Sequence, residues 1–166
     1  MKSNEHAFGF IGCMARRAVG AAEIIDVFGR MGIRVQPLRA GMVFGKEHLE
    51  SACLHALRAV ERGEGASDDI MAEVALYTGC SRQLSRSLSL VRIEGDREIV
   101  MVTMPEIGES TLAAILEELG LERDDALMEL TEGKLTNAPL LGIEEKDVAA
   151  VREAVLEKIA LVDVER

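Results

Sequence analysis

Apolar residues recur at helical spacing in six segments of this chain, whereas only three runs have the composition of strands. A helix with an apolar face must pack that face against a partner. The predicted strands are residues 6–13, 34–44 and 92–104, and the predicted helices are residues 19–31, 47–61, a helix capped by Ser67, 81–91, 111–119 and 148–160. Helices that outnumber strands in irregular order predict an α+β fold, with a small mixed or antiparallel sheet packed with several helices. The length of 166 residues predicts a single domain over residues 1–166.

Two local signals refine these elements. Gly95-Asp96 predicts a hairpin-like turn within residues 92–104. Ser67 is expected to cap the helix that follows it, because a hydroxyl accepts a hydrogen bond from the first backbone amides and the next two residues are aspartates.

The composition is that of a globular chain with an aliphatic core. Apolar residues make up 48% and charged residues 29%, which excludes a disordered chain. Aromatic residues make up only 3%, so the core must be built from Leu, Val, Ile, Ala and Met. No apolar run approaches the roughly 20 residues that span a bilayer, and the first residues lack the apolar region of a signal peptide. Three cysteines without CxxC spacing are typical of free thiols in a reducing compartment, so we expect a cytoplasmic protein that contacts no membrane.

The net charge of −10 is distributed unevenly along the chain. Residues 1–92 carry 12 Lys/Arg and 10 Asp/Glu, whereas residues 93–166 carry 7 Lys/Arg and 19 Asp/Glu. Such asymmetry is typical of proteins with charged partners. The acidic half would repel nucleic acid or bind a basic protein, and the first half retains enough cations for a local basic patch. The alternative is that the acidic residues only keep the protein in solution.

The helix predicted over residues 47–61 has two contrasting faces. Its apolar stripe consists of Leu49, Cys53, Ala56, Leu57 and Val60. The opposite face, which has no carboxylate, consists of His48, Ser51, His55, Arg58 and Arg62. A solvated surface is one interpretation of this polar face. The other is a binding surface, because imidazole and guanidinium groups suit phosphates and bases.

A second cationic cluster begins the helix predicted over residues 81–91. Arg82 and Arg86 lie four residues apart on one face, and Gln83 adjoins them. Like charges at this spacing destabilise an isolated helix slightly. An anionic ligand would favour them, and an internal ion pair with Glu73 or Glu50 is the alternative.

The sequence contains no convincing catalytic or metal motif. Residues 41–46 are similar to a phosphate-binding loop but are one residue short and lack the Ser or Thr that holds magnesium. His48 and His55 need a third ligand to hold a metal, and Cys53 points away from both. Cys80 precedes a helix, where a thiolate is stabilised, but no base is adjacent in sequence. We therefore expect no catalytic residue, metal or cofactor.

Four short motifs lie within about residues 35–93: Gly45-Lys-Glu-His48-Leu49, Ala56-Leu-Arg58-Ala59, Glu73-Val-Ala-Leu-Tyr77 and Arg82-Gln83-Leu84. In this combination the chain resembles the small kinase-binding subunit of the KEOPS complex, the family of the PRPK-binding protein and its archaeal relatives. Two positions depart from the family pattern. Arg39 stands where the family has an acid, and Gly79-Cys80 shifts by one residue the glycine of the family's Ser-Gly.

The resemblance implies an accessory protein rather than an enzyme. KEOPS makes the threonylcarbamoyl modification on the adenosine next to the anticodon of ANN-decoding tRNAs. The family member binds the N-lobe of the atypical kinase-ATPase of the complex and supports its activity. In archaea it also binds the single-stranded CCA end of tRNA.

Together with the cationic clusters, the resemblance predicts tRNA contacts at His48, His55, Arg58, Arg82, Gln83 and Arg86. For Arg82 and Gln83, a structural role in ordering the loop at Gly79 is the alternative. Kinase contacts are predicted among Leu84, Leu88, Val151 and Val155, and burial in the core of the domain is the alternative for each.

Two other functions stay open at this point. One is a small metabolite-binding or enzymatic domain that uses the region of His48, His55 and Cys80. The other is an interaction module that binds protein and never RNA.

Overall fold

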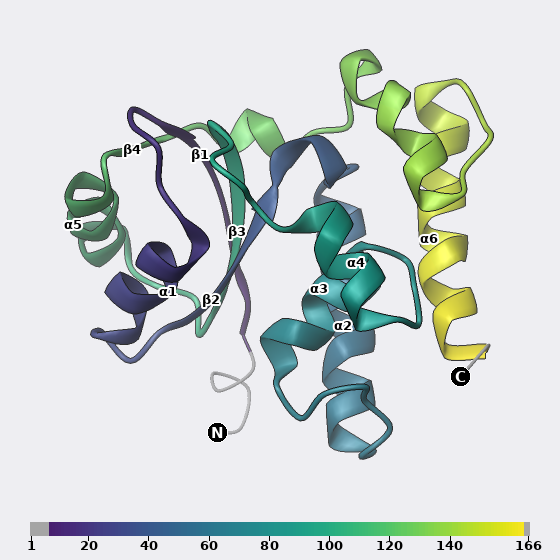
Figure 1. Cartoon of the computed structure of the whole chain (residues 1–166), viewed down its shortest axis with the longest axis horizontal. Helices are drawn as coiled ribbons and strands as arrows, with labels where there is room; N and C mark the ends of the chain where they lie inside the picture. The colour runs from purple at the N-terminus through teal and green to yellow at the C-terminus, as the bar shows by residue number, and fades with distance from the viewer. Residues whose placement is uncertain (1–6, 165–166) are drawn as a thin grey trace. The chain divides into compact units, whose positions relative to one another are not determined.

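Four antiparallel strands form one sheet, in the order β2-β3-β1-β4 (Figure 1). They are β1 (Gly9–Ala15), β2 (Arg34–Arg39), β3 (Glu98–Met104) and β4 (Leu121–Arg123). The prediction of an α+β fold with a small antiparallel sheet is confirmed. The predicted hairpin within residues 92–104 is wrong, because this segment contributes only β3, whose partners are β1 and β2.

The structure, a computed structural model, describes residues 7–164. His6, the first residue of the first predicted strand, lies outside the described residues. The chain folds into two compact units, each assembled from two separate segments. The sheet unit comprises residues 1–40 and 92–128, and the helical unit comprises residues 41–91 and 129–166. The single domain over residues 1–166 stays a prediction.

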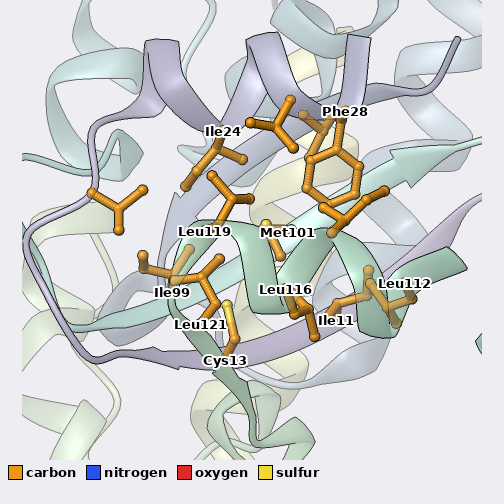
Figure 2. Close-up of a cluster of buried hydrophobic side chains, with 14 of the residues drawn as sticks. Ile11, Cys13, Ile24, Phe28, Ile99, Met101, Leu112, Leu116, Leu119 and Leu121 are labelled. Carbon is orange, nitrogen blue, oxygen red and sulfur yellow. The ribbon is translucent and has the colours of Figure 1, made fainter. Parts of the chain in front are cut away.

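The core of the sheet unit lies between one face of the sheet and two helices, α1 (Ala21–Gly29) and α5 (Glu109–Leu119). Figure 2 shows side chains of β1, β3 and both helices meeting in this cluster. Alternate strand residues point to the same face, so Ile11 and Met101, which are paired in register, both enter it. Most of the cluster is aliphatic, as the low aromatic content predicts, and Phe28 is its one ring.

Gly12 permits a close chain crossing over β1. The chain that crosses β1 at this point is the segment around Asp124, which continues into the short 3₁₀ helix η2 (Asp125–Met128). This helix packs against β1 and β3. The amide of Gly12 donates to Asp125 Oδ1 over 3.1 Å, and its carbonyl accepts from the amide of Asp124 over 2.7 Å. A Cβ at position 12 would lie 2.3 Å from the Asp124 carbonyl oxygen, so only glycine fits without a shift of the backbone.

The helical unit consists of helices that pack around α3 (Ile70–Thr78) and α6 (Val148–Val164). Its other members are α2 (Lys46–Glu61), α4 (Leu84–Val91) and the 3₁₀ helix η3 (Glu132–Leu141). α3 packs against α2, α4 and α6, and α6 also contacts α2 and η3. Between the two units in sequence, the second predicted strand ends at Arg39, where the 3₁₀ turn η1 (Ala40–Met42) begins.

The cap of α3 differs from the prediction. Asp69 is the N-cap, and its side chain accepts from the amide of Met71 over 3.0 Å. The hydroxyl of Ser67 instead accepts from the amide of Asp69 over 3.1 Å, which orders the residues before the cap. Asp and Ser have similar N-cap preferences, so the sequence alone does not rank these two neighbours.

None of the helices within residues 7–164 combines the length and apolar character needed to cross a bilayer.

Candidate functional site

The junction between α3 and α4 is fixed by one close contact. Gly79 follows α3, and a Cβ there would lie 2.6 Å from both Cβ and Oγ of Ser87 on α4. The hydroxyl of Ser87 donates to the carbonyl oxygen of Leu76 over 2.8 Å, which ties the two helices together at this point. The contact between Gly79 and Ser87 therefore fixes the point from which the loop from Cys80 to Gln83 starts.

Cys80 turns the chain out of α3 with a φ of 54°, in the left-handed region that favours glycine. The amide of Gln83 then donates to the hydroxyl of Ser81 over 3.1 Å, and α4 begins one residue later. This turn places the side chains of Arg82, Gln83 and Arg86 at one open hollow in the surface of the helical unit.

The hollow, here called the cationic pocket, has a volume of about 810 Å³. It is lined by Glu64, Gly65, Ala66, Gly79, Cys80, Ser81, Arg82, Gln83, Arg86, Leu140, Leu141, Gly142 and Lys158. These residues come from the segment before α3, the α3–α4 junction, the end of η3 and α6. Three of the six predicted tRNA-binding residues thus gather at one site.

The charge of the pocket is positive. Arg82, Arg86 and Lys158 line it, against one carboxylate among its described lining residues, Glu64. The side chains of Arg86 and Lys158 make no hydrogen bond or ion pair with any residue from 7 to 164. Cations that have no protein partner and share a concave surface are suited to a multiply charged anion.

The thiol of Cys80 is not set up as a nucleophile. Burial raises its pKa to about 12, although the positive charge of Lys158 acts in the opposite direction. Its sulfur lies 3.8 Å from the carbonyl oxygen of Thr78. A neutral thiol at physiological pH lacks the thiolate that nucleophilic catalysis requires.

His48 does not lie on an exposed stripe, and that expectation is wrong. Its side chain is fully buried, with 0% exposure. Nδ1 accepts from the amide of Phe44 over 2.9 Å, so Nε2 carries the proton and donates to the carbonyl oxygen of Thr78 over 3.0 Å. Both nitrogens are used within the protein, which leaves His48 no atom for a phosphate, a metal or the thiol of Cys80.

The surroundings of His48 also hold it neutral. Burial lowers its pKa to about 4, an effect that the bond to Thr78 opposes and that the positive charge of Lys134 reinforces. Lys134 is fixed nearby by a bond from its ammonium to the carbonyl oxygen of Val43, over 2.8 Å. The neutral imidazole therefore bridges the start of α2 to the end of α3 as a structural element.

The rest of the predicted stripe on α2 is dispersed as well. His55 is half-buried, and its Nδ1 lies 2.5 Å from Oδ2 of Asp163 on α6. The hydroxyl of Tyr77 donates to the other carboxylate oxygen of Asp163. Arg58 is exposed but does not line the cationic pocket. The polar face of α2 is thus divided between a buried bridge, a contact with α6 and open solvent.

The four predicted kinase contacts fall into two pairs. Val151 and Val155 have 0% exposure and form part of the core of the helical unit, so neither is available to a partner. Leu84 and Leu88 on α4 are half-buried. Burial, the alternative stated for each of them, holds for the two valines. The large apolar side chains that α6 exposes are Leu161 and Val164, with 45% and 77% exposure.

The division into units changes what the charge asymmetry means. The sheet unit carries 9 Lys/Arg and 13 Asp/Glu, and the helical unit carries 10 Lys/Arg and 16 Asp/Glu. Because each unit takes chain from both halves of the sequence, the contrast between halves becomes a mild acidity of both units. Within the helical unit, Arg82, Arg86 and Lys158 gather in the cationic pocket.

Neither Arg39 nor a metal-binding cluster forms part of the site within residues 7–164. The guanidinium of Arg39 lies 3.1 Å from the carboxylate of Asp96 in an ion pair within the sheet unit. Within residues 7–164, no group of three or more His, Cys, Asp or Glu side chains is arranged to hold a metal ion.

Sequence reasoning missed Lys158, Gly142 and Asp163. Lys158 lies in a predicted helix, but its distance in sequence from Arg86 gives no sign that the two side chains share a pocket.

For His48, the sequence did contain a signal for its structural role. It is the third residue of α2, where a side chain can accept a hydrogen bond from a backbone amide before the helix, as in a capping box.

Comparison with known proteins adds no assignment: no family model matches this chain, and the search of curated proteins finds no match.

Proposed function

We propose that this chain is the non-catalytic, kinase-binding subunit of a KEOPS complex of archaeal type, and that its cationic pocket binds the 3′ CCA end of tRNA. In this role it supports the threonylcarbamoyl modification of the adenosine next to the anticodon. The observation that carries the proposal is the convergence of Arg82, Gln83 and Arg86, three residues of the motif-bearing region, at one pocket.

A single-stranded RNA end suits this pocket chemically. Guanidinium groups bind phosphates bidentately and also stack on bases, so arginines serve both parts of a nucleotide. Gln83 adds an amide that can donate to and accept from the edge of a base. No Phe, Tyr or His side chain within residues 7–164 lines the pocket, so stacking on this surface falls to the arginines.

For the kinase-ATPase, we propose the exposed end of α6 in place of its buried valines. Leu161 and Val164 lie three residues apart on one helical face and are exposed. Stable protein interfaces have an apolar centre, which buried Val151 and Val155 do not provide. A pull-down with the kinase-ATPase should lose this chain when Leu161 is changed to Asp, whereas Ile25→Asp on the sheet unit should leave it bound.

The His48, His55 and Cys80 set gains no support as a metabolite or catalytic site. His48 is buried with both nitrogens bonded, and the pKa of Cys80 is raised. A module that binds only protein remains distinguishable by experiment.

The test is a binding titration of the purified chain against intact tRNA and the same tRNA without its terminal CCA. We expect binding to the intact tRNA and its loss when CCA is removed. Equal binding to both RNAs would refute recognition of the 3′ end. No binding to either RNA, with the kinase pull-down still positive, would identify a module that binds only protein.

A further inference from the structure

The cationic pocket has a wall that none of the sequence motifs supplies. Lys158 of α6 lines it together with Arg82 and Arg86 of the α3–α4 junction. A Cβ at Gly142 would lie 3.0 Å from Nζ of Lys158, so the ammonium passes directly over this glycine. Gly142 is itself a lining residue, which places the ammonium at the η3 end of the pocket.

Lys158 is carried by a helix with a fixed position in the helical unit. Its neighbours Val155, Ile159 and Val162 are buried in the core. One turn further on, Asp163 contacts both Tyr77 and His55. Side chains on a packed helix are positioned more precisely than those on a loop. The backbone at Lys158 is therefore fixed, and its ammonium lies at the pocket beside Gly142.

The ammonium of Lys158 is also available for a ligand. It forms no hydrogen bond or ion pair with any residue that the structure describes. Its charge nonetheless acts on the thiol of Cys80, inside the same pocket, which supports its position there. Lys158 shares the pocket with two guanidinium groups, and a bound anion would offset the repulsion among these like charges.

We propose that α6 contributes directly to RNA binding in the cationic pocket, and that its Lys158 contacts a phosphate of the bound single strand. This inference rests on the proposed function and adds to it an element and a residue outside the motif-bearing region. In consequence, the RNA site needs two segments that are far apart in the sequence, and displacement of α6 removes one of its cations.

The test compares Lys158→Gln with Lys146→Gln, which removes the same charge from an exposed lysine of the same unit that does not line the pocket. The Kd for intact tRNA is measured at several salt concentrations. We expect Lys158→Gln to weaken binding about fivefold or more and to reduce the slope of log K against log salt by about 0.7, the value for one phosphate of a single strand. Lys158→Arg should keep most of the affinity, and Lys146→Gln should match the unmodified protein.

The outcomes separate this inference from the function on which it rests. If Lys158→Gln binds with unchanged Kd and slope while Arg86→Gln is weakened, the inference is overturned and the RNA pocket stands. If Lys146→Gln is weakened as much as Lys158→Gln, the effect is one of overall charge and the inference is again overturned. If the unmodified chain binds no tRNA, the proposed function fails, and the inference fails with it.

Discussion

The polar face of α2 and the α3–α4 junction look alike in the sequence but differ in the folded chain. Both are short cationic patterns at helical spacing, and the sequence predicts RNA contacts for both. On α2 the structure buries His48, places His55 against Asp163 and leaves Arg58 exposed. At the junction, Arg82 and Arg86 reach one pocket. Helical spacing places side chains on one face, but the elements that cover the face decide what it does.

The covering elements explain the difference. α2 packs against α3 and α6, which supply the carbonyl of Thr78 and the carboxylate of Asp163 as partners for its histidines. The cationic end of the junction instead lines an open hollow. Imidazole side chains thus have structural roles on α2, whereas Arg86 at the junction faces the pocket without a partner among residues 7–164.

The largest effect concerns the buried role of His48. Its pKa is lowered from 6.5 to about 4 in the folded chain, so the unfolded chain takes up this proton first as the pH falls. Stability from this group is therefore present above pH 6.5 and is lost as the pH falls towards 4. The difference corresponds to about 3 kcal/mol. Urea unfolding at pH 7 and pH 4.5 should show most of this loss, and His48→Gln should remove most of the difference between the two pH values.

Glutamine suits this experiment because its amide can accept from Phe44 and donate to Thr78 without titrating. The comparison is between the two pH values within each protein, so any constant cost of the substitution cancels. A His48→Gln protein that loses as much stability on acidification as the unmodified chain would place the imidazole at the surface after all.

The second effect concerns the contact that sets the junction. Gly79→Ala places a Cβ 2.6 Å from Ser87, so α4 must move away from α3. Overpacking of this kind costs about 1 to 3 kcal/mol, and we expect roughly 2 in urea unfolding. The matched control is Gly29→Ala, a helical glycine with no atom within 4 Å of its added Cβ, which should be neutral or stabilising. Equal effects of the two changes would mean that the junction is loosely packed.

The third prediction sets the two cationic regions directly against each other. Arg86→Glu and Arg58→Glu make the same change of charge, one in the pocket and one on α2. We expect Arg86→Glu to weaken tRNA binding at least tenfold, or about 1.4 kcal/mol, and Arg58→Glu to change it less than twofold. Fluorescence anisotropy with intact tRNA measures both. The reverse order would restore the predicted stripe on α2 as the RNA surface.

The sequence predicted what is local and missed what is not. Helices α1, α2 and α6 match their predicted ranges within a few residues because each has a clear apolar period. β4 was missed because a strand of three residues, held by its pairing with β1, has no period of its own. The residues of the pocket differ in the same way: those close together in sequence were predicted, and the distant one was not. Arg82 and Arg86 are neighbours in one motif, whereas Lys158 joins them only through the packing of α6.

The smallest effect tests the backbone that the junction requires. Cys80 adopts a φ of 54°, in the left-handed region that favours glycine. In most helix or strand positions Ala is more stable than Gly, because glycine loses more conformational entropy on folding. Here the order should reverse, since a Cβ in the left-handed region costs about 1 to 2 kcal/mol. Cys80→Gly should therefore be about 1 kcal/mol more stable than Cys80→Ala in urea unfolding.

Both variants lack the sulfur, so their difference isolates the backbone from the packing of the thiol. If Ala is the more stable of the two, the turn relaxes without a left-handed residue, and the junction is less constrained than the contact between Gly79 and Ser87 implies.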